Sequence, residues 1–169
     1  GVLGMAGTSP EFIDAQMKKV KTLTDKKFGV DLLAADPKSL EASVDAIIEN
    51  GADSFVAGLG VPMPIMKKLK DAGVKVMVVG GAVKHAIKAE EAGCDAVILQ
   101  GGEGGGHTGL VGTLPLVAQA RGTRAIEIVV VRPSVATRLV GGQSVGIGRT
   151  ASGAAPSIPG NQPVGDLAP

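Results

Sequence analysis

The stretch Gly73–Gln100, GVKVMVVGGAVKHAIKAEEAGCDAVILQ, holds one complete strand–helix–strand unit. Val74–Val79 has the length and the β-branched residues of a strand. Residues Val83–Ala92 place apolar side chains at helical spacing and end at Gly93, the residue type that most often closes a helix. Ala96–Leu99 is a second strand. Two strands joined by one helix run parallel with a right-handed crossover, so the stretch predicts an α/β fold.

The same unit recurs along the chain. Ser9–Glu11 supplies an N-cap, a first-turn proline and an acid, and so predicts a helix that runs to about Leu23. Asp36 and Pro37 predict the start of a second helix. Helix-ending glycines recur at nearly constant spacing, which leaves room for one helix, one strand and short loops; they are Gly51, Gly73 and Gly93. Strands are also expected at Val2–Met5, Phe28–Leu33 and Ser54–Ala57, and a further helix at Pro62–Ala72.

This short repeat predicts an α/β fold of the (β/α)8 TIM-barrel type, although a doubly wound sheet has the same local pattern. A full barrel takes about 250 residues, and this chain has 169. Five strands are expected before residue 100 and two weaker ones near residues 126–131 and 144–147. We therefore expect an incomplete barrel over residues 1–150 and an irregular Pro/Gly-rich tail over residues 151–169.

The composition changes in the last third of the chain. All lysines precede residue 121, and all arginines lie at or after it. The segment from residue 151, ASGAAPSIPGNQPVGDLAP, has no periodicity and is predicted to lack regular structure. An ordinary polar tail and a disrupted reading frame near residue 121 are both consistent with this change.

Composition excludes several classes of function. Trp and Tyr are absent and only three Phe occur, which argues against the aromatic platforms of nucleic-acid binding. The single cysteine, Cys94, excludes an internal disulfide and a cysteine-based metal site. No apolar run reaches the roughly 20 residues of a membrane helix, and no secretion leader is recognised. We expect a cytoplasmic protein without metal, membrane or nucleic-acid partners, which could form a homo-oligomer.

Three glycine-rich segments follow expected strands: residues 58–60, 80–81 and 101–109. In parallel α/β folds the carboxyl ends of the strands gather the ligand-binding loops, so these segments should share one rim. Glycine lets a flat or anionic ligand approach the main chain closely. Ordinary turn glycines are an equally good explanation for the first two segments.

The third segment also carries side chains that could act on a ligand. Gln100 ends the strand, and Glu103 and His107 follow on the same loop. Imidazole can act as an acid or a base near neutral pH. An incidental surface histidine is the alternative. His85 is expected to be a solvated helix residue without a role, and Cys94 to be a small buried residue.

Several segments, in order, resemble the nitronate monooxygenase family, formerly 2-nitropropane dioxygenases, and its relatives the FMN-dependent enoyl-ACP reductases. They are GVLGMAG at 1–7, LTDKKFGVDLL at 23–33, GLGVP at 58–62, AGCDAVILQGGEGGGHTG at 92–109 and GTLPLV at 112–117. The resemblance extends to about residue 120, and the fourth segment is the specific one.

The resemblance implies a TIM barrel that binds FMN and oxidises a nitronate to a carbonyl compound and nitrite with O2. It implies that His107 is the catalytic base or orients the small-molecule substrate. Asp31 stands where the family usually has asparagine, and a carboxylate cannot donate a hydrogen bond. The cofactor-binding residues implied in this way are Asp31, Gln100, Gly101, Gly105, Gly106, Gly146 and Gly148.

The resemblance leaves alternatives open. NAD(P)H-dependent reduction of an enoyl thioester uses a nearly identical flavin site, but such enzymes tend to carry glutamate at the position of Gln100. The family's paired glycines for the FMN phosphate are expected where this chain has Val129–Pro133, and Gly146–Thr150 only loosely resembles a second phosphate turn. A truncated fragment without activity is therefore the third interpretation.

Overall fold

The computed structural model describes residues 1–121, 126–130, 137–140 and 143–146. The chain divides into two compact units, Gly1–Arg132 and Pro133–Pro169. The described part of the second unit is one antiparallel pair of strands, β7 (Thr137–Val140) and β8 (Gln143–Gly146). Gly146 is the last residue of β8, and Gly148 lies outside the described residues.

The first unit contains a parallel sheet whose six described strands follow one another in chain order. A doubly wound sheet would reverse its strand order, whereas consecutive order is that of a barrel. The weak strand expected near residues 126–131 is confirmed as the sixth strand. The strands are β1 (Val2–Gly4), β2 (Gly29–Leu33), β3 (Ser54–Gly58), β4 (Lys75–Gly80), β5 (Ala96–Leu99) and β6 (Glu127–Val130).

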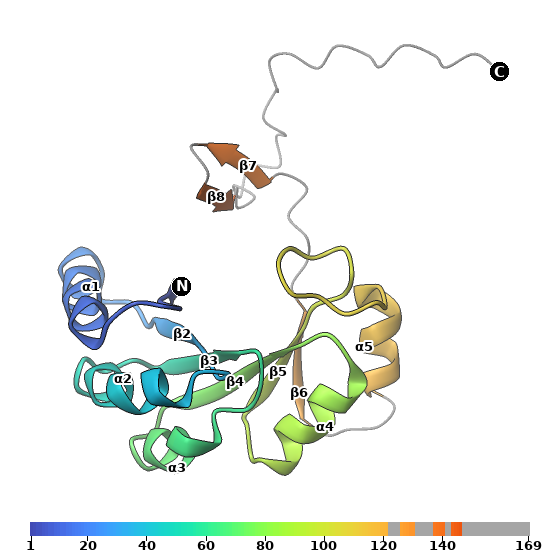
Figure 1. Ribbon diagram of the computed structural model, residues 1–169, viewed down its shortest axis with the longest axis horizontal. Coiled ribbons are helices and arrows are strands. Elements are labelled where there is room, and N and C mark those ends of the chain that lie inside the picture. Colours follow the sequence, from blue (N-terminus) through green and yellow to red (C-terminus); the bar gives the residue numbers. More distant parts are fainter. Residues whose placement is uncertain (122–125, 131–136, 141–142, 147–169) are drawn as a thin grey trace. The chain divides into compact units, whose positions relative to one another are not determined.

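Five described helices cover one side of this sheet (Figure 1). They are α1 (Pro10–Leu23), α2 (Pro37–Glu49), α3 (Met63–Asp71), α4 (Val83–Glu91) and α5 (Thr113–Arg121). The first four were expected from the sequence. The fifth was not, because it buries a threonine and an alanine beside a single leucine and so shows only a weak apolar stripe.

The predicted helix ends are confirmed in atomic detail. The Ser9 hydroxyl accepts a hydrogen bond from the backbone N–H of Phe12 at the start of α1. The three glycines that follow α2, α3 and α4 adopt the left-handed conformation, with φ of 67°, 76° and 78°. A residue with a Cβ would be strained there, so glycine stops each helix and turns the chain into the next strand.

The core lies between the helices and one face of the sheet. Alternate strand residues point into it and meet apolar side chains from the helices, as strand geometry requires. Its largest fully buried side chains include Phe55, Ile13, Met17, Leu40, Ile47, Leu69, Leu99 and Leu116. The residues between them point to the opposite face, the face that lines the interior of a barrel.

Asp95, in the turn between α4 and β5, forms hydrogen bonds to α3 and to β4. Its carboxylate accepts hydrogen bonds from Lys70 Nζ at 2.5 Å, Lys75 Nζ at 3.1 Å and the backbone N–H of Val76 at 2.8 Å. Burial alone would raise the pKa of Asp95, but these hydrogen bonds outweigh it and hold the pKa at about 2.

Glu103 closes the long loop between β5 and α5. Both of its carboxylate oxygens accept a hydrogen bond from the backbone N–H of Thr113, at 2.8 and 3.0 Å. The Thr113 hydroxyl in turn accepts from the N–H of Gly101 at 3.0 Å. Hydrogen bonds from its own N–H and from that of Thr113 lower the pKa of Glu103, so the carboxylate is ionised at neutral pH. An anion at a helix N-terminus is favourable, and here it ties the two ends of the loop together.

The closed loop packs against the end of β4 through a close approach of backbone atoms. A Cβ added to Gly109 would collide with the carbonyl oxygen of Gly81, and one added to Gly81 would collide with the backbone N of Gly109. A Cβ on Gly101 would collide with the N of Thr113. The glycines are therefore required by close backbone contact, which fixes where the loop can lie.

Replacing Asp95 with asparagine tests its role in the fold. Because its folded pKa of about 2 lies below the ordinary 3.8, the carboxylate stabilises the fold above about pH 4, and this contribution is lost as the pH falls toward 2. We expect Asp95→Asn to lower the free energy of unfolding by about 1 kcal/mol at pH 7, a small value because the lysines are partly solvated. Urea unfolding should show the two proteins converging near pH 2. A difference in the free energy of unfolding that does not change with pH would contradict this role of Asp95. An equal loss of stability in the exposed control Asp25→Asn would contradict it as well.

Replacing Glu103 with alanine tests the loop closure. The Thr113 N–H loses both acceptors, so its amide and that of Gly101 should exchange hydrogen severalfold faster in NMR or mass-spectrometric exchange measurements. Glu103→Gln keeps one oxygen as an acceptor, so its exchange rates should lie between those of the unmodified chain and those of Glu103→Ala. Glu91→Ala, an exposed change on α4, should leave both amides as they are. Unchanged protection in Glu103→Ala would show that the loop is held by other contacts.

Candidate functional site

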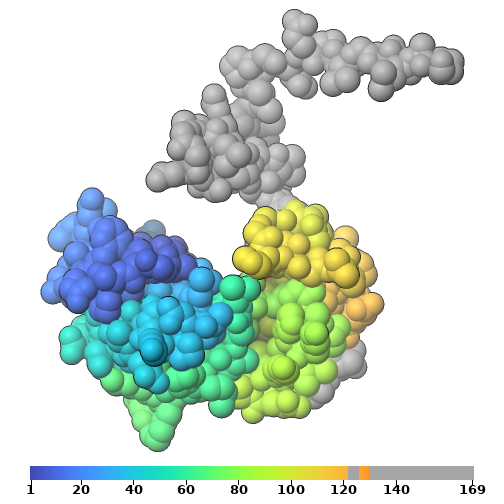
Figure 2. Space-filling view, viewed as in Figure 1, coloured from blue at the N-terminus to red at the C-terminus, as the bar shows by residue number. Residues whose placement is uncertain are grey.

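The carboxyl ends of β2 to β5 open onto a cavity of about 870 Å3 within the first unit. The three glycine-rich segments predicted to share one rim all contribute to its lining, so that prediction is confirmed. In Figure 2 the surface is recessed between the yellow loop after β5 and the blue N-terminal residues. The lining residues used below are Asp31, Leu33, Leu59, Gly60, Gly81, His85, Lys88, Gln100, Gly105, His107 and Gly109.

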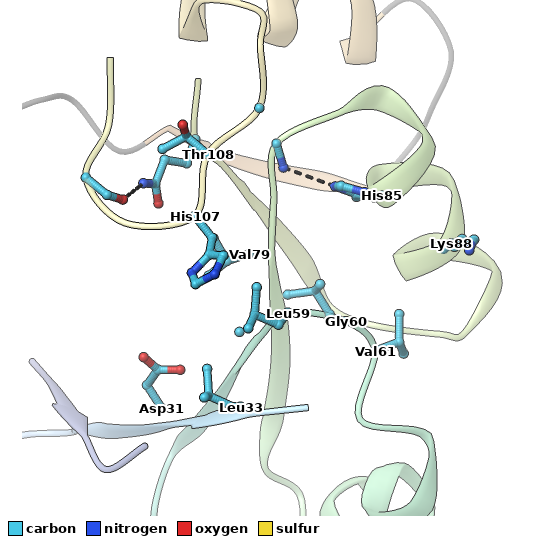
Figure 3. A pocket seen from close by; sticks show the side chains of 16 residues that line it. Asp31, Leu33, Leu59, Gly60, Val61, Val79, His85, Lys88, His107 and Thr108 are labelled. Carbon is cyan, nitrogen blue, oxygen red and sulfur yellow. Dashed lines mark hydrogen bonds between the residues drawn. The ribbon is translucent and has the colours of Figure 1, made fainter. Parts of the chain in front are cut away.

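His107 is exposed to solvent and lines the cavity. Its ring lies on the same side of the cavity as Asp31 and Leu33 (Figure 3). Gly106, the residue before it, has a φ of 74°, a conformation that glycine adopts without strain. This left-handed residue turns the chain so that the imidazole is carried on the cavity side of the loop.

Gln100 continues from the end of β5 and supports the loop from within. Its backbone N–H donates to the carbonyl of Gly80 at 3.0 Å, and its side-chain Nε2 donates to the carbonyl of Gly105 at 2.5 Å. A Cβ on Gly104 would lie 2.5 Å from that same Nε2. The amide Oε1 makes no hydrogen bond to the described residues. It is therefore available to accept one from a ligand.

Asp31 brings a carboxylate to the cavity from β2. Its Oδ1 is buried and has no hydrogen-bond partner among the described residues, and burial raises the pKa of this carboxyl. A buried oxygen without a donor is costly, so it is normally satisfied by a ligand or by water. Asp31 therefore suits a ligand that presents an N–H or O–H group at this place.

His85 differs from its predicted role. The sequence favoured a solvated helix residue, but the ring is half-buried and lines the cavity. Its Nδ1 accepts a hydrogen bond from the N–H of Gly81 at 3.1 Å, and a Cβ on Gly80 would lie 2.7 Å from the His85 Cβ. Desolvation, and then the charges of Lys84 and Lys88, lower the pKa of His85. Side chains in the first helical turn point back toward the preceding strand end, which is the signal that sequence reasoning missed.

Leu59 is a second residue that the sequence did not single out. It follows β3 with a φ of 57°, a conformation that is rare and strained for a residue with a branched side chain. This strained residue lies in the lining of the cavity, where Leu59 and Gly60 separate Asp31 and His107 from His85 and Lys88 (Figure 3).

The other predicted site residues divide into three groups. Gly105 lines the cavity, as do Asp31, Gln100 and His107. Gly101 and Gly106 shape the loop without being lining residues. Gly146 belongs to the second unit, whose position relative to the cavity is not described. Cys94 is buried as expected, and burial raises the pKa of its thiol.

The described part of the chain shows neither a cluster of metal-binding side chains nor a membrane-spanning helix. No group of three or more His, Cys, Asp or Glu side chains there could hold a metal ion. None of the described helices combines the length and the apolar character needed to cross a bilayer.

Comparison with known proteins places this geometry in a family. The family model for nitronate monooxygenase matches residues 1–135. The chain is 42% identical over 123 residues to the (3aS,4S,5R,7aS)-5-hydroxy-7a-methyl-1-oxo-octahydro-1H-indene-4-carboxyl-CoA dehydrogenase of Rhodococcus jostii, covering 71% of this chain and 35% of that protein. It is 30% identical over 131 residues to a probable nitronate monooxygenase of Staphylococcus saprophyticus, covering 67% of this chain and 37% of that protein.

A solved structure supports the same assignment. FabK from Thermotoga maritima superposes with a TM-score of 0.72 at 32% identity, covering 77% of this chain and 42% of that chain. The chain thus spans about a third to two fifths of the length of these three proteins. Its six parallel strands and five helices form part of a TIM barrel. The chain belongs to the nitronate monooxygenase family.

Proposed function

We propose that this chain supplies the flavin-facing residues of an FMN-dependent oxidoreductase that converts nitronates to a carbonyl compound and nitrite with O2. The observation that carries the proposal is the meeting of Asp31, Gln100, Gly105 and His107 around one cavity at the carboxyl ends of the strands. Family membership and a cavity of this size agree with it.

The residues present suit a flat heterocycle. Bare backbone at Gly60 and Gly105 leaves room for a ring to lie against the main chain. Asp31 Oδ1 can accept from a ring N–H, and Gln100 Oε1 can accept from a second donor. FMN, when bound, would supply the electron-transfer chemistry that no side chain of this chain provides. The protein supplies binding, orientation and proton handling.

His107 is the proposed acid or base. A neutral imidazole has one unprotonated nitrogen, which can take the proton from the carbon beside the nitro group of a nitroalkane and leave the nitronate. Its other nitrogen carries an N–H that can donate to a nitronate oxygen and orient the substrate. Both roles require the ring to reach the cavity, where the structure places it.

A second candidate function is oxidoreduction of a carboxyl-CoA thioester. The observation that favours it is the 42% identity to a carboxyl-CoA dehydrogenase, against 30% to a probable nitronate monooxygenase. Enoyl-thioester reduction with NAD(P)H, which the sequence resemblance leaves open, belongs to the same class of thioester chemistry. In these reactions His107 would act beside a thioester carbonyl instead of a nitro group.

Replacing His107 with alanine tests the assigned chemistry. We expect the affinity for FMN, measured by fluorescence quenching, to change little. The proposed contacts to the flavin ring come from the backbone and from side chains other than His107. Nitrite release from a neutral nitroalkane with O2 should fall about 100-fold or more, the usual size of a general-base effect. Release from the preformed nitronate should fall less, because that substrate loses only the orienting hydrogen bond. Leu110→Ala, at an exposed position of the same loop that does not line the cavity, should retain most of the activity.

Three outcomes would contradict the proposal in different ways. Full nitrite release by His107→Ala would show that another group handles the proton. Flavin reduction by a carboxyl-CoA thioester, without nitrite release from nitronates, would favour the second candidate. Failure of the unmodified chain to bind FMN would favour the inactive-fragment interpretation.

A further inference from the structure

The cavity has a second side that the proposed redox chemistry does not use. His107, Asp31 and Leu33 lie on one side, and His85 and Lys88 of α4 lie on the other, with Leu59 and Gly60 between them (Figure 3). Among the residues that the structure describes, Asp31 is the only acidic one in the lining, and it belongs to the first side. The side formed by α4 is therefore basic.

His85 presents a hydrogen-bond donor there. Its Nδ1 accepts from the N–H of Gly81 at 3.1 Å, so the proton of the neutral ring is on Nε2. Desolvation and the two neighbouring lysines lower its pKa, which keeps the ring neutral near pH 7. The Gly81 contact also fixes the orientation of the ring. His85 thus offers one oriented N–H group without a buried charge.

Lys88 adds a positive charge beside that donor. It lies three residues after His85 on α4, a spacing that places two side chains on the same helix face. Lys88 is exposed and makes no ion pair with the residues that the structure describes. Lys84, one residue before His85, adds to the positive potential felt by the ring. An oriented N–H donor beside an unpaired ammonium group is a combination that binds oxyanions.

We propose that His85 and Lys88 form a phosphate-binding subsite at the α4 side of the cavity. The inference rests on the proposed function, because it takes a substrate or cofactor that carries phosphate to be seated in this cavity. The CoA portion of a thioester substrate is the source we expect, because the family resemblance implies that the phosphate of FMN lies near residues 129–133. FMN is the alternative source that the test distinguishes. The subsite is open to solvent, so its contribution should be electrostatic and should weaken with added salt.

Charge reversal at Lys88 tests the subsite. We expect Lys88→Glu to weaken binding of the phosphate-bearing ligand about tenfold at low ionic strength, with a smaller effect at high salt. Calorimetric titrations with acetyl-CoA and with acetyl-pantetheine, which lacks the phosphates, form one arm. Fluorescence titrations with FMN and with riboflavin form the other. A selective loss for acetyl-CoA names the substrate as the source, and a selective loss for FMN names the cofactor.

Three further variants make the result specific. Lys19→Glu changes the net charge equally on an exposed position of α1 and should leave all four affinities unchanged. His85→Leu should weaken the same ligand as Lys88→Glu, whereas His85→Gln, which keeps a side-chain N–H, should recover part of the binding. Circular dichroism should show that each variant is folded.

The proposal is overturned if Lys88→Glu changes no affinity, if it weakens riboflavin and acetyl-pantetheine equally, or if Lys19→Glu has the same effect. The riboflavin arm separates this result from failure of the proposed function. If riboflavin does not bind the unmodified chain, the flavin proposal fails, while the acetyl-CoA arm still reports on the phosphate subsite.

Discussion

The close contact between the backbones of Gly81 and Gly109 is the constraint on which the candidate site depends. It seats the loop after β5 directly on the end of β4, with no space for a Cβ on either residue. Glu103 then ties the loop to the start of α5. Because the loop cannot lie elsewhere without breaking these contacts, His107 and Gln100 share one cavity with Asp31 from a distant strand.

Much of the fold could be predicted because its local signals agree with one another. Caps, helix-ending glycines and apolar strands mark four helices and five strands without reference to the rest of the chain. The α5 helix gave no such signal, since it buries Thr113 and Ala120 and depends on Glu103, ten residues earlier, for its start. Its existence is decided by tertiary contacts, which a local pattern does not show.

The site was predictable to a different extent. The glycine-rich loop indicated Gln100 and His107, and the family resemblance added Gly105; all three line the cavity. His85 was misjudged, since its flanking lysines resemble those of a solvated helix and only the contact with Gly81 shows that the ring faces the cavity. The strain at Leu59 and the unpartnered oxygen of Asp31 are products of three-dimensional packing. Neither could be read from residue order.

The most direct test of the account is a two-dimensional amide NMR titration of the isotope-labelled chain with FMN. We predict saturable shifts at the amides of Gly81, Gln100, Gly105, His107 and Asp31, with the amides of α1 unchanged. Shifts confined to residues outside the cavity, or no saturable shifts at all, would contradict the claim that this loop and strand end form a flavin site.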